Sequence, residues 1–174
     1  MPSIPQPLAG DHAPYYGKYI EPFLESDILV AMAAQIGEAQ DMLQPLDAAS
    51  ALHRYAPGKW SVKELLGHLI DTERLFLYRA TRIARAAPAA LPGMAEDAWV
   101  AAADFDRIPL ADLLDEFVAL RRSTVRFFAA LSPEALTRAG TANGHRIVVR
   151  AIPYITAGHV AHHLEVLRTR YLTP

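Results

Sequence analysis

Apolar residues recur three or four positions apart along four long segments of the chain, and stretches rich in proline and glycine separate these segments. This spacing places the apolar side chains on one face of a helix and the polar side chains on the other. We therefore predict helices over about 26–44, 61–86, 109–132 and 148–171. Four long amphipathic helices with short or irregular joins indicate an all-α protein that folds as a four-helix bundle.

Capping residues mark the starts of the first two helices. Ser26 is the expected N-cap of the first helix, with Asp27 in its first turn, and Pro45 should follow its end. Ser61 and Glu64 have the S-x-x-E spacing of a capping box, in which each side chain accepts a hydrogen bond from the other residue's main-chain N–H. The second helix therefore has the best-defined start.

The other two helices begin near prolines. Pro109 suits the N1 position of the third helix, where no main-chain N–H is needed. Pro153 falls early in the last segment, so either the helix proper begins near this residue or its first turn is kinked there. Residues 146–152 (RIVVRAI) form the best β-strand candidate, but they directly precede the strongest helical pattern, which favours a helix start. No strand is predicted.

Two proline-rich stretches lie outside the helical pattern. Residues 1–25 contain five prolines, which exclude a long helix, together with aromatic residues that a free tail would not need. We expect this arm to lie against the bundle formed by residues 26–174 and to contain one short helical turn. Residues 88–109 are long for a connection, which indicates a short helix within them or a functional loop.

Composition limits the kind of protein further. The 174 residues fit one domain, and 52% hydrophobic with 21% charged residues can bury a core. A net charge of −2, without a visible basic stripe, argues against a nucleic-acid partner. The chain has no cysteine, which excludes disulfides, thiolate metal ligands and a cysteine nucleophile. No apolar run is long enough to cross a bilayer and the first residues lack a signal-peptide pattern, so we expect a cytoplasmic protein without a membrane partner.

Three histidines carry the candidate chemistry. His159 and His163 are four residues apart on the last helix, so both imidazoles lie on one face, one turn apart. His68, on the second helix, would complete a three-nitrogen metal site with an open position for water or substrate, which suits zinc or nickel. The competing interpretation is an ordinary buried histidine, satisfied by hydrogen bonds. His162 could share the face of His159, but His163 gives the one-turn spacing, so His162 is expected to point aside.

The sequence assigns no catalytic base. Val160 occupies the position that a glutamate takes in the HExxH pattern of zinc proteases. Glu64, Asp71 and Thr72 lie one turn from the histidine of the second helix, and Glu165 lies two residues beyond the last histidine. Residues of these types are more often surface charges or helix caps, so the catalytic residues stay unassigned.

Two sequence blocks resemble a known family. The W-S-x-K-E-x-x-G-H block at 60–68 and the G-H-x-x-H-H block at 158–163, in this order, resemble the second helix and the C-terminal metal helix of the DinB-like (DinB/YfiT) superfamily. APYYGKYIEPF at 13–23 and ALRRSTVRFFAALSPEAL at 119–136 are also similar to it. The resemblance therefore covers nearly the whole chain.

This resemblance implies both a topology and a cofactor. The family folds as an up-down-down-up four-helix bundle, commonly as a homodimer. Its divalent metal, nickel or zinc, is held by three histidines, which correspond here to His68, His159 and His163.

The resemblance also implies classes of reaction. Relatives include proteins assigned as metal-dependent hydrolases and enzymes that use low-molecular-weight thiols as transferases or isomerases. We expect a metal-dependent hydrolase or a thiol-dependent transferase acting on a small molecule. Because the chain has no cysteine, any thiol must come from a cofactor. The alternative is a non-catalytic helical module with a structural or vestigial metal site.

Overall fold

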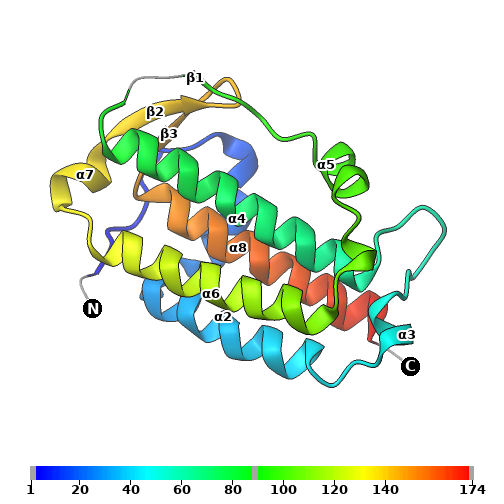
Figure 1. Ribbon diagram of the computed structural model, residues 1–174. Helices are drawn as coiled ribbons and strands as arrows, with labels where there is room; N and C mark the ends of the chain where they lie inside the picture. Colours follow the sequence, from blue (N-terminus) through cyan, green and yellow to red (C-terminus); the bar gives the residue numbers. More distant parts are fainter. Residues whose placement is uncertain (1–2, 88–89, 173–174) are drawn as a thin grey trace.

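Four long helices form the body of the molecule in a computed structural model that describes residues 3–87 and 90–172 (Figure 1). They are α2 (Ile28–Leu43), α4 (Val62–Ala84), α6 (Leu110–Ala129) and α8 (Ala151–Val166). The closely packed pairs are α2–α6, α4–α6, α2–α8 and α4–α8, so α2 and α4 lie on a diagonal. In Figure 1, α2 and α8 run in one direction and α4 and α6 in the opposite direction. This is the predicted up-down-down-up bundle.

Local chemistry explains where the helices begin. The capping box of α4 is confirmed, because the Ser61 hydroxyl accepts from the Glu64 N–H at 3.0 Å and the Glu64 carboxylate accepts from the Ser61 N–H at 2.8 Å. Helix α2 is capped by Asp27, so the prediction of Ser26 is wrong by one residue. The Asp27 carboxylate accepts hydrogen bonds from main-chain N–H groups of the first turn, which fixes the start. Pro109 was predicted at the N1 position of α6 but is its N-cap, one residue earlier.

Helix α8 accommodates its proline without interruption. The helix begins at Ala151, which makes Pro153 its third residue. The first N–H groups of a helix have no intrahelical acceptor, so a proline there removes no hydrogen bond. Of the two alternatives for the last helix, the start near Pro153 is therefore confirmed. After Val166 the chain continues as a π-helical turn, Leu167–Tyr171.

A small three-stranded sheet contradicts the prediction that no strand is present. Its strands are β1 (Ala90–Leu91), β2 (Ala139–Ala142) and β3 (His145–Val148). β2 and β3 are antiparallel and β1 pairs with β2 in parallel. Asn143 and Gly144 have φ values of 51° and 76°, which is the left-handed conformation that a two-residue hairpin turn requires. The turn pairs β3 with β2, so part of the segment 146–152 that was expected to start the last helix forms a strand instead.

The arm and the connections contain short helices. These are η1 (Pro14–Tyr16), α1 (Gly17–Ile20), η2 (Glu21–Phe23), α3 (Ala48–Ala51), α5 (Glu96–Ala103), η3 (Phe105–Arg107) and α7 (Pro133–Thr137). The segment 88–109 thus contains a short helix, one of its two predicted forms, and its residues 88–89 lie outside the described residues. Helix α1 packs on α8, where a Cβ on Gly158 would lie 1.9 Å from the carbonyl oxygen of Tyr19.

Two apolar clusters fill the bundle, and a layer of polar side chains, to which all four helices contribute, lies between them. One cluster holds Met32, Phe76, Phe128 and Ile155, and the other holds Leu43, Leu66, Phe117 and Leu164. Between the clusters, Arg121 of α6 donates from Nε to Glu73 of α4 at 3.0 Å and from Nη1 to Gln35 of α2 at 2.7 Å. The Gln35 amide donates to the Ala157 carbonyl of α8 at 2.8 Å. This layer therefore links the four helices at mid-height.

None of the helices within 3–87 and 90–172 has both the length and the hydropathy that a membrane span requires.

Candidate metal centre

The three predicted histidines come together at one place in the bundle. His68 projects from α4, and His159 and His163 project from successive turns of α8. The Nε2 atoms of His68 and His159 are 3.1 Å apart. One nitrogen from each of the three rings lies within 4.8 Å of the other two. The three rings are therefore close enough to hold one ion after small side-chain rotations, because two nitrogens joined to the same zinc by bonds of about 2.0–2.1 Å lie at most about 4.2 Å apart.

Burial keeps all three imidazoles neutral. His68 is 2% exposed, His159 is 8% exposed and His163 is half-buried. Burial lowers the pKa of His68 to about 4 and, with the neighbouring His68 and His162 adding to the effect, lowers the pKa of His163 to about 3. Burial and the adjacent imidazoles also hold the pKa of His159 well below its usual range. Each ring therefore has a free nitrogen lone pair at neutral pH, which is the form that binds a metal.

The hydrogen bonding of these rings is incomplete. Only one of the two facing Nε2 atoms of His68 and His159 can carry a proton toward the other. Nδ1 of His163 is buried and has no hydrogen-bond partner among the described residues. Three neutral nitrogen donors with an unsatisfied buried nitrogen fit a divalent cation.

Aromatic rings surround the three histidines. The Trp60 ring lies 4.7 Å from that of His68, measured between centroids. The rings of Tyr19 and Phe76 lie 5.8 Å and 6.3 Å from that of His159. Tyr19 comes from the arm, and no pattern in the sequence singled out this residue. These rings shield the histidines from water.

His162 lies outside the group of three. It is exposed, and its ring is 5.9 Å from that of Tyr19. It therefore does not join the group of three, although it also lines the cavity beside them.

The acidic candidates for a base have other partners. Glu64 caps α4 and pairs with Arg54. Asp71 pairs with Arg74 at 3.3 Å. A cavity described below opens beside the histidines, and none of the three candidate carboxylates, Glu64, Asp71 and Glu165, lines it. Thr72 does line it, with its hydroxyl oxygen 3.5 Å from Nδ1 of His68.

The third carboxylate, Glu165, is also occupied, since it pairs with Arg168 one turn further along. Of the four candidates only Thr72 therefore lies beside the histidines.

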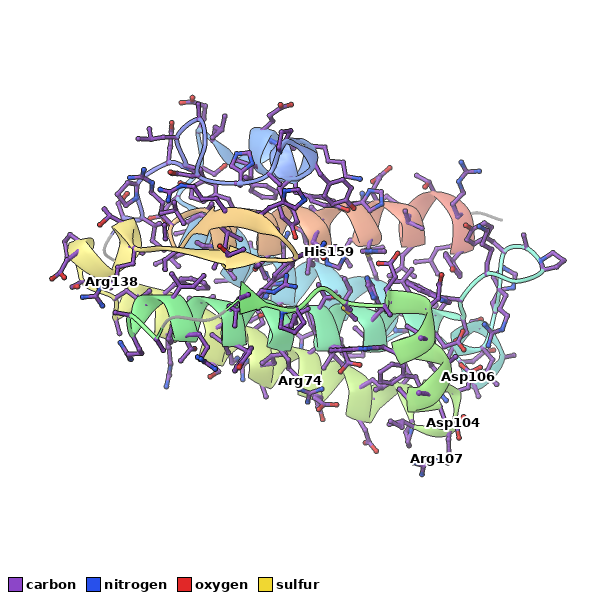
Figure 2. The ribbon with its side chains drawn as sticks, turned by 90° about the horizontal axis from the view of Figure 1, so that it is seen from above. Arg74, Asp104, Asp106, Arg107, Arg138 and His159 are labelled. Carbon is purple, nitrogen blue, oxygen red and sulfur yellow. The ribbon has the colours of Figure 1, made fainter. Side chains whose placement is uncertain are left out.

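A cavity of about 370 Å³ opens beside the three histidines. The arm, α4, α8, the segment before α5 and the tip of the β2–β3 hairpin enclose it, and Figure 2 shows His159 beside this hairpin. Its lining includes Tyr15, Tyr16, Lys18, Tyr19, Trp60, His68, Thr72, Phe76, Arg79, Met94, Glu96, Asn143 and His159. A second cavity of about 370 Å³ also reaches His163 and shares Trp60 and Glu96 with the first. A small molecule could therefore approach the histidines from two sides.

A glycine precedes one histidine on each of the two site helices. A Cβ on Gly67 would lie 2.4 Å from the Phe105 ring, and a Cβ on Gly158 would lie 1.9 Å from the Tyr19 carbonyl oxygen. Both glycines let another segment approach the helix directly beside a histidine of the site. In each of the two sequence blocks, the glycine therefore makes room for a neighbouring segment and the histidine that follows it faces the site.

The fold and the site define a helical-bundle protein with a three-histidine centre, and the comparisons identify its family. The DinB superfamily matches residues 31–167, so the chain belongs to that superfamily. Its structure is similar to that of YfiT from Bacillus subtilis, described as a probable metal-dependent hydrolase with an unusual four-helix bundle topology. The TM-score is 0.71 at 15% identity, over 81% of this chain and 84% of that one. At this identity the likeness establishes the fold. No curated protein matches the sequence.

Proposed function

We propose that this DinB-superfamily protein is a metal-dependent enzyme that acts on a small molecule. In this proposal His68, His159 and His163 hold one nickel or zinc ion. The observation that carries the proposal is the convergence of three neutral imidazoles on the wall of a cavity of about 370 Å³. Such a cavity accommodates a small substrate and keeps much of it away from bulk water.

The residues around the histidines have defined roles. Trp60, Tyr19 and Phe76 limit the contact of the imidazoles with bulk water, which strengthens electrostatic interactions at the site. The Thr72 hydroxyl faces Nδ1 of His68 and helps to orient this ring. A bound divalent metal would supply Lewis acidity, which lowers the pKa of a water or thiol nucleophile.

The proposed reaction is hydrolysis or the transfer of a low-molecular-weight thiol. The chain contains no cysteine, and the two carboxylates that line the cavities at the histidines, Glu96 and Asp97, are exposed. In this proposal the nucleophile comes from outside the protein, as water or as a thiol cosubstrate. The description of YfiT as a probable metal-dependent hydrolase supports the first of these.

A paired screen tests the proposal. Protein loaded with nickel or zinc would be incubated with p-nitrophenyl esters, and separately with cysteine or glutathione and the electrophile 1-chloro-2,4-dinitrobenzene. We expect turnover in at least one arm, lost on chelation and in His68→Ala, and retained in the control His53→Ala, which changes a histidine outside the group of three. Metal binding without turnover in either arm would favour the non-catalytic helical module.

The stability of metal-free protein should fall as the pH decreases below about 6.5. The folded protein holds His68 neutral down to a pKa of about 4 and His163 down to about 3, whereas the unfolded chain takes up these protons near the ordinary value of 6.5. Each such histidine lowers the free energy of unfolding by about 1.4 kcal/mol per pH unit within this window.

Urea denaturation of chelator-treated protein at pH 7, 6 and 5 measures the effect. The His68→Leu variant should show a shallower dependence, because its side chain binds no proton in either state. A wild-type stability that is constant from pH 7 to 5 would contradict the burial of neutral histidines.

We further propose that the protein forms a homodimer, as members of the superfamily commonly do. Light scattering should give twice the mass of one chain, and the mass of a single chain would refute the dimer.

A further inference from the structure

Arg79 shares the face of α4 that carries His68. The residues of α4 that line the cavity include His68, Thr72, Phe76 and Arg79, which follow one another at intervals of three or four positions. One wall of the cavity is therefore a single helical stripe. A histidine of the proposed metal site stands at one end of it and a guanidinium at the other.

Arg79 is a buried cation without an acidic partner. It is 3% exposed, and among residues 3–87 and 90–172 no aspartate or glutamate pairs with it. Nη2 donates to the Pro92 carbonyl, the Tyr16 hydroxyl interacts with the guanidinium, and the Phe76 ring lies 5.7 Å from Cζ. Nε is buried and has no hydrogen-bond partner. Because burying an unpaired charge is costly, a guanidinium in these surroundings is suited to bind an anion.

The distance from Arg79 to the histidines suits a small ligand. The Phe76 ring lies 5.7 Å from Cζ of Arg79 and 6.3 Å from the ring centroid of His159. One aromatic ring therefore separates the guanidinium from the histidine cluster. The other charged groups on the cavity wall are Lys18 and Glu96, both of them exposed.

We propose that Arg79 binds a carboxylate of the substrate or cosubstrate while the reacting end of the same molecule lies at the three histidines. This inference rests on the proposed function and adds the class of ligand, a small carboxylic acid. A guanidinium can pair with a carboxylate through Nε and an adjacent N–H, which donate two hydrogen bonds, and Nε of Arg79 has no other partner. If Arg79 served only to donate to the Pro92 carbonyl, there would be no reason for its Nε–H to be buried without an acceptor.

Matched acid and alcohol probes test the proposal. The dissociation constants of 6-mercaptohexanoate and 6-mercapto-1-hexanol would be measured with metal-free protein by calorimetry. With cobalt(II)-loaded protein they would be measured by the thiolate absorption band. Wild-type protein should bind the acid at least about tenfold more tightly than the alcohol. This preference should disappear in Arg79→Met, be reduced in Arg79→Lys and persist in the control Arg82→Met.

Equal affinities for acid and alcohol in wild-type protein would overturn the proposal, and so would an unchanged preference in Arg79→Met. If Arg79→Met does not fold, an unchanged preference in Arg79→Lys overturns it equally. A cobalt(II) sample that shows no thiolate band with either probe would count against the metal site alone. In that case the preference of metal-free protein for the acid would still decide the role of Arg79.

Discussion

Replacing Arg121 by methionine is expected to lower the free energy of unfolding by about 3–5 kcal/mol, measured by urea denaturation near neutral pH. The side chains of Arg121 and Glu73 are 0% and 1% exposed, so the substitution leaves a carboxylate in the core without its counter-charge. It also removes the donor to Gln35, whose amide holds the Ala157 carbonyl of α8. The loss should therefore loosen all four helices at mid-height.

Two further variants separate the buried charge from other effects. Arg74→Met breaks an ion pair with Glu116 in which the side chains are 49% and 42% exposed, and should cost less than about 1 kcal/mol. Combining Arg121→Met with Glu73→Leu should recover stability, since no unpaired charge remains in the core. The interpretation is wrong if Arg121→Met destabilises the protein no more than Arg74→Met does.

The Gly158→Ala variant is expected to destabilise the protein by about 1–3 kcal/mol and to release the arm from α8. The added Cβ would lie 1.9 Å from the carbonyl oxygen of Tyr19, and a main-chain atom cannot turn aside as a flexible side chain can. Displacing Tyr19 would also open one wall of the cavity. Urea denaturation measures the first effect, and limited proteolysis within residues 3–25 measures the second.

Gly37→Ala is the matched control for this variant. Gly37 lies within α2, and a Cβ there would meet nothing within 4 Å. The change should raise stability by about 0.5–1 kcal/mol, because alanine favours the helix over glycine. Equal stability and equal protease resistance of Gly158→Ala and wild-type protein would show that the arm does not need this close approach.

The four helices were predictable from the spacing of their apolar residues, and in α4 the predicted cap agrees with that spacing. The Ser61–Glu64 capping box defined the start of α4, and the position of Pro153 was compatible with the first turn of α8. The hairpin was missed because its strands have four residues each, too few for an alternating pattern to stand out. The Asn143-Gly144 pair was the available signal, since this dipeptide is the strongest short-range indication of a hairpin.

The candidate site was predictable only in part. The spacing of His159 and His163 placed them on one face, His68 on the second helix was the candidate third ligand, and the family resemblance supported the same three residues. The contribution of Tyr19 depends on how the arm packs on α8, which no local pattern encodes. Arg79 did leave a signal, because it lies on the helical face of His68, but a single arginine at that position is ordinarily a surface charge.

The metal content of the purified protein tests the central claim most directly. Protein without affinity-tag histidines, analysed for nickel and zinc, should contain about one ion per chain in the wild type and in the control His162→Ala. His68→Ala, His159→Ala and His163→Ala should each contain almost none. A wild-type protein without stoichiometric metal, or a His68→Ala variant with the same metal content as the wild type, would contradict the three-histidine centre.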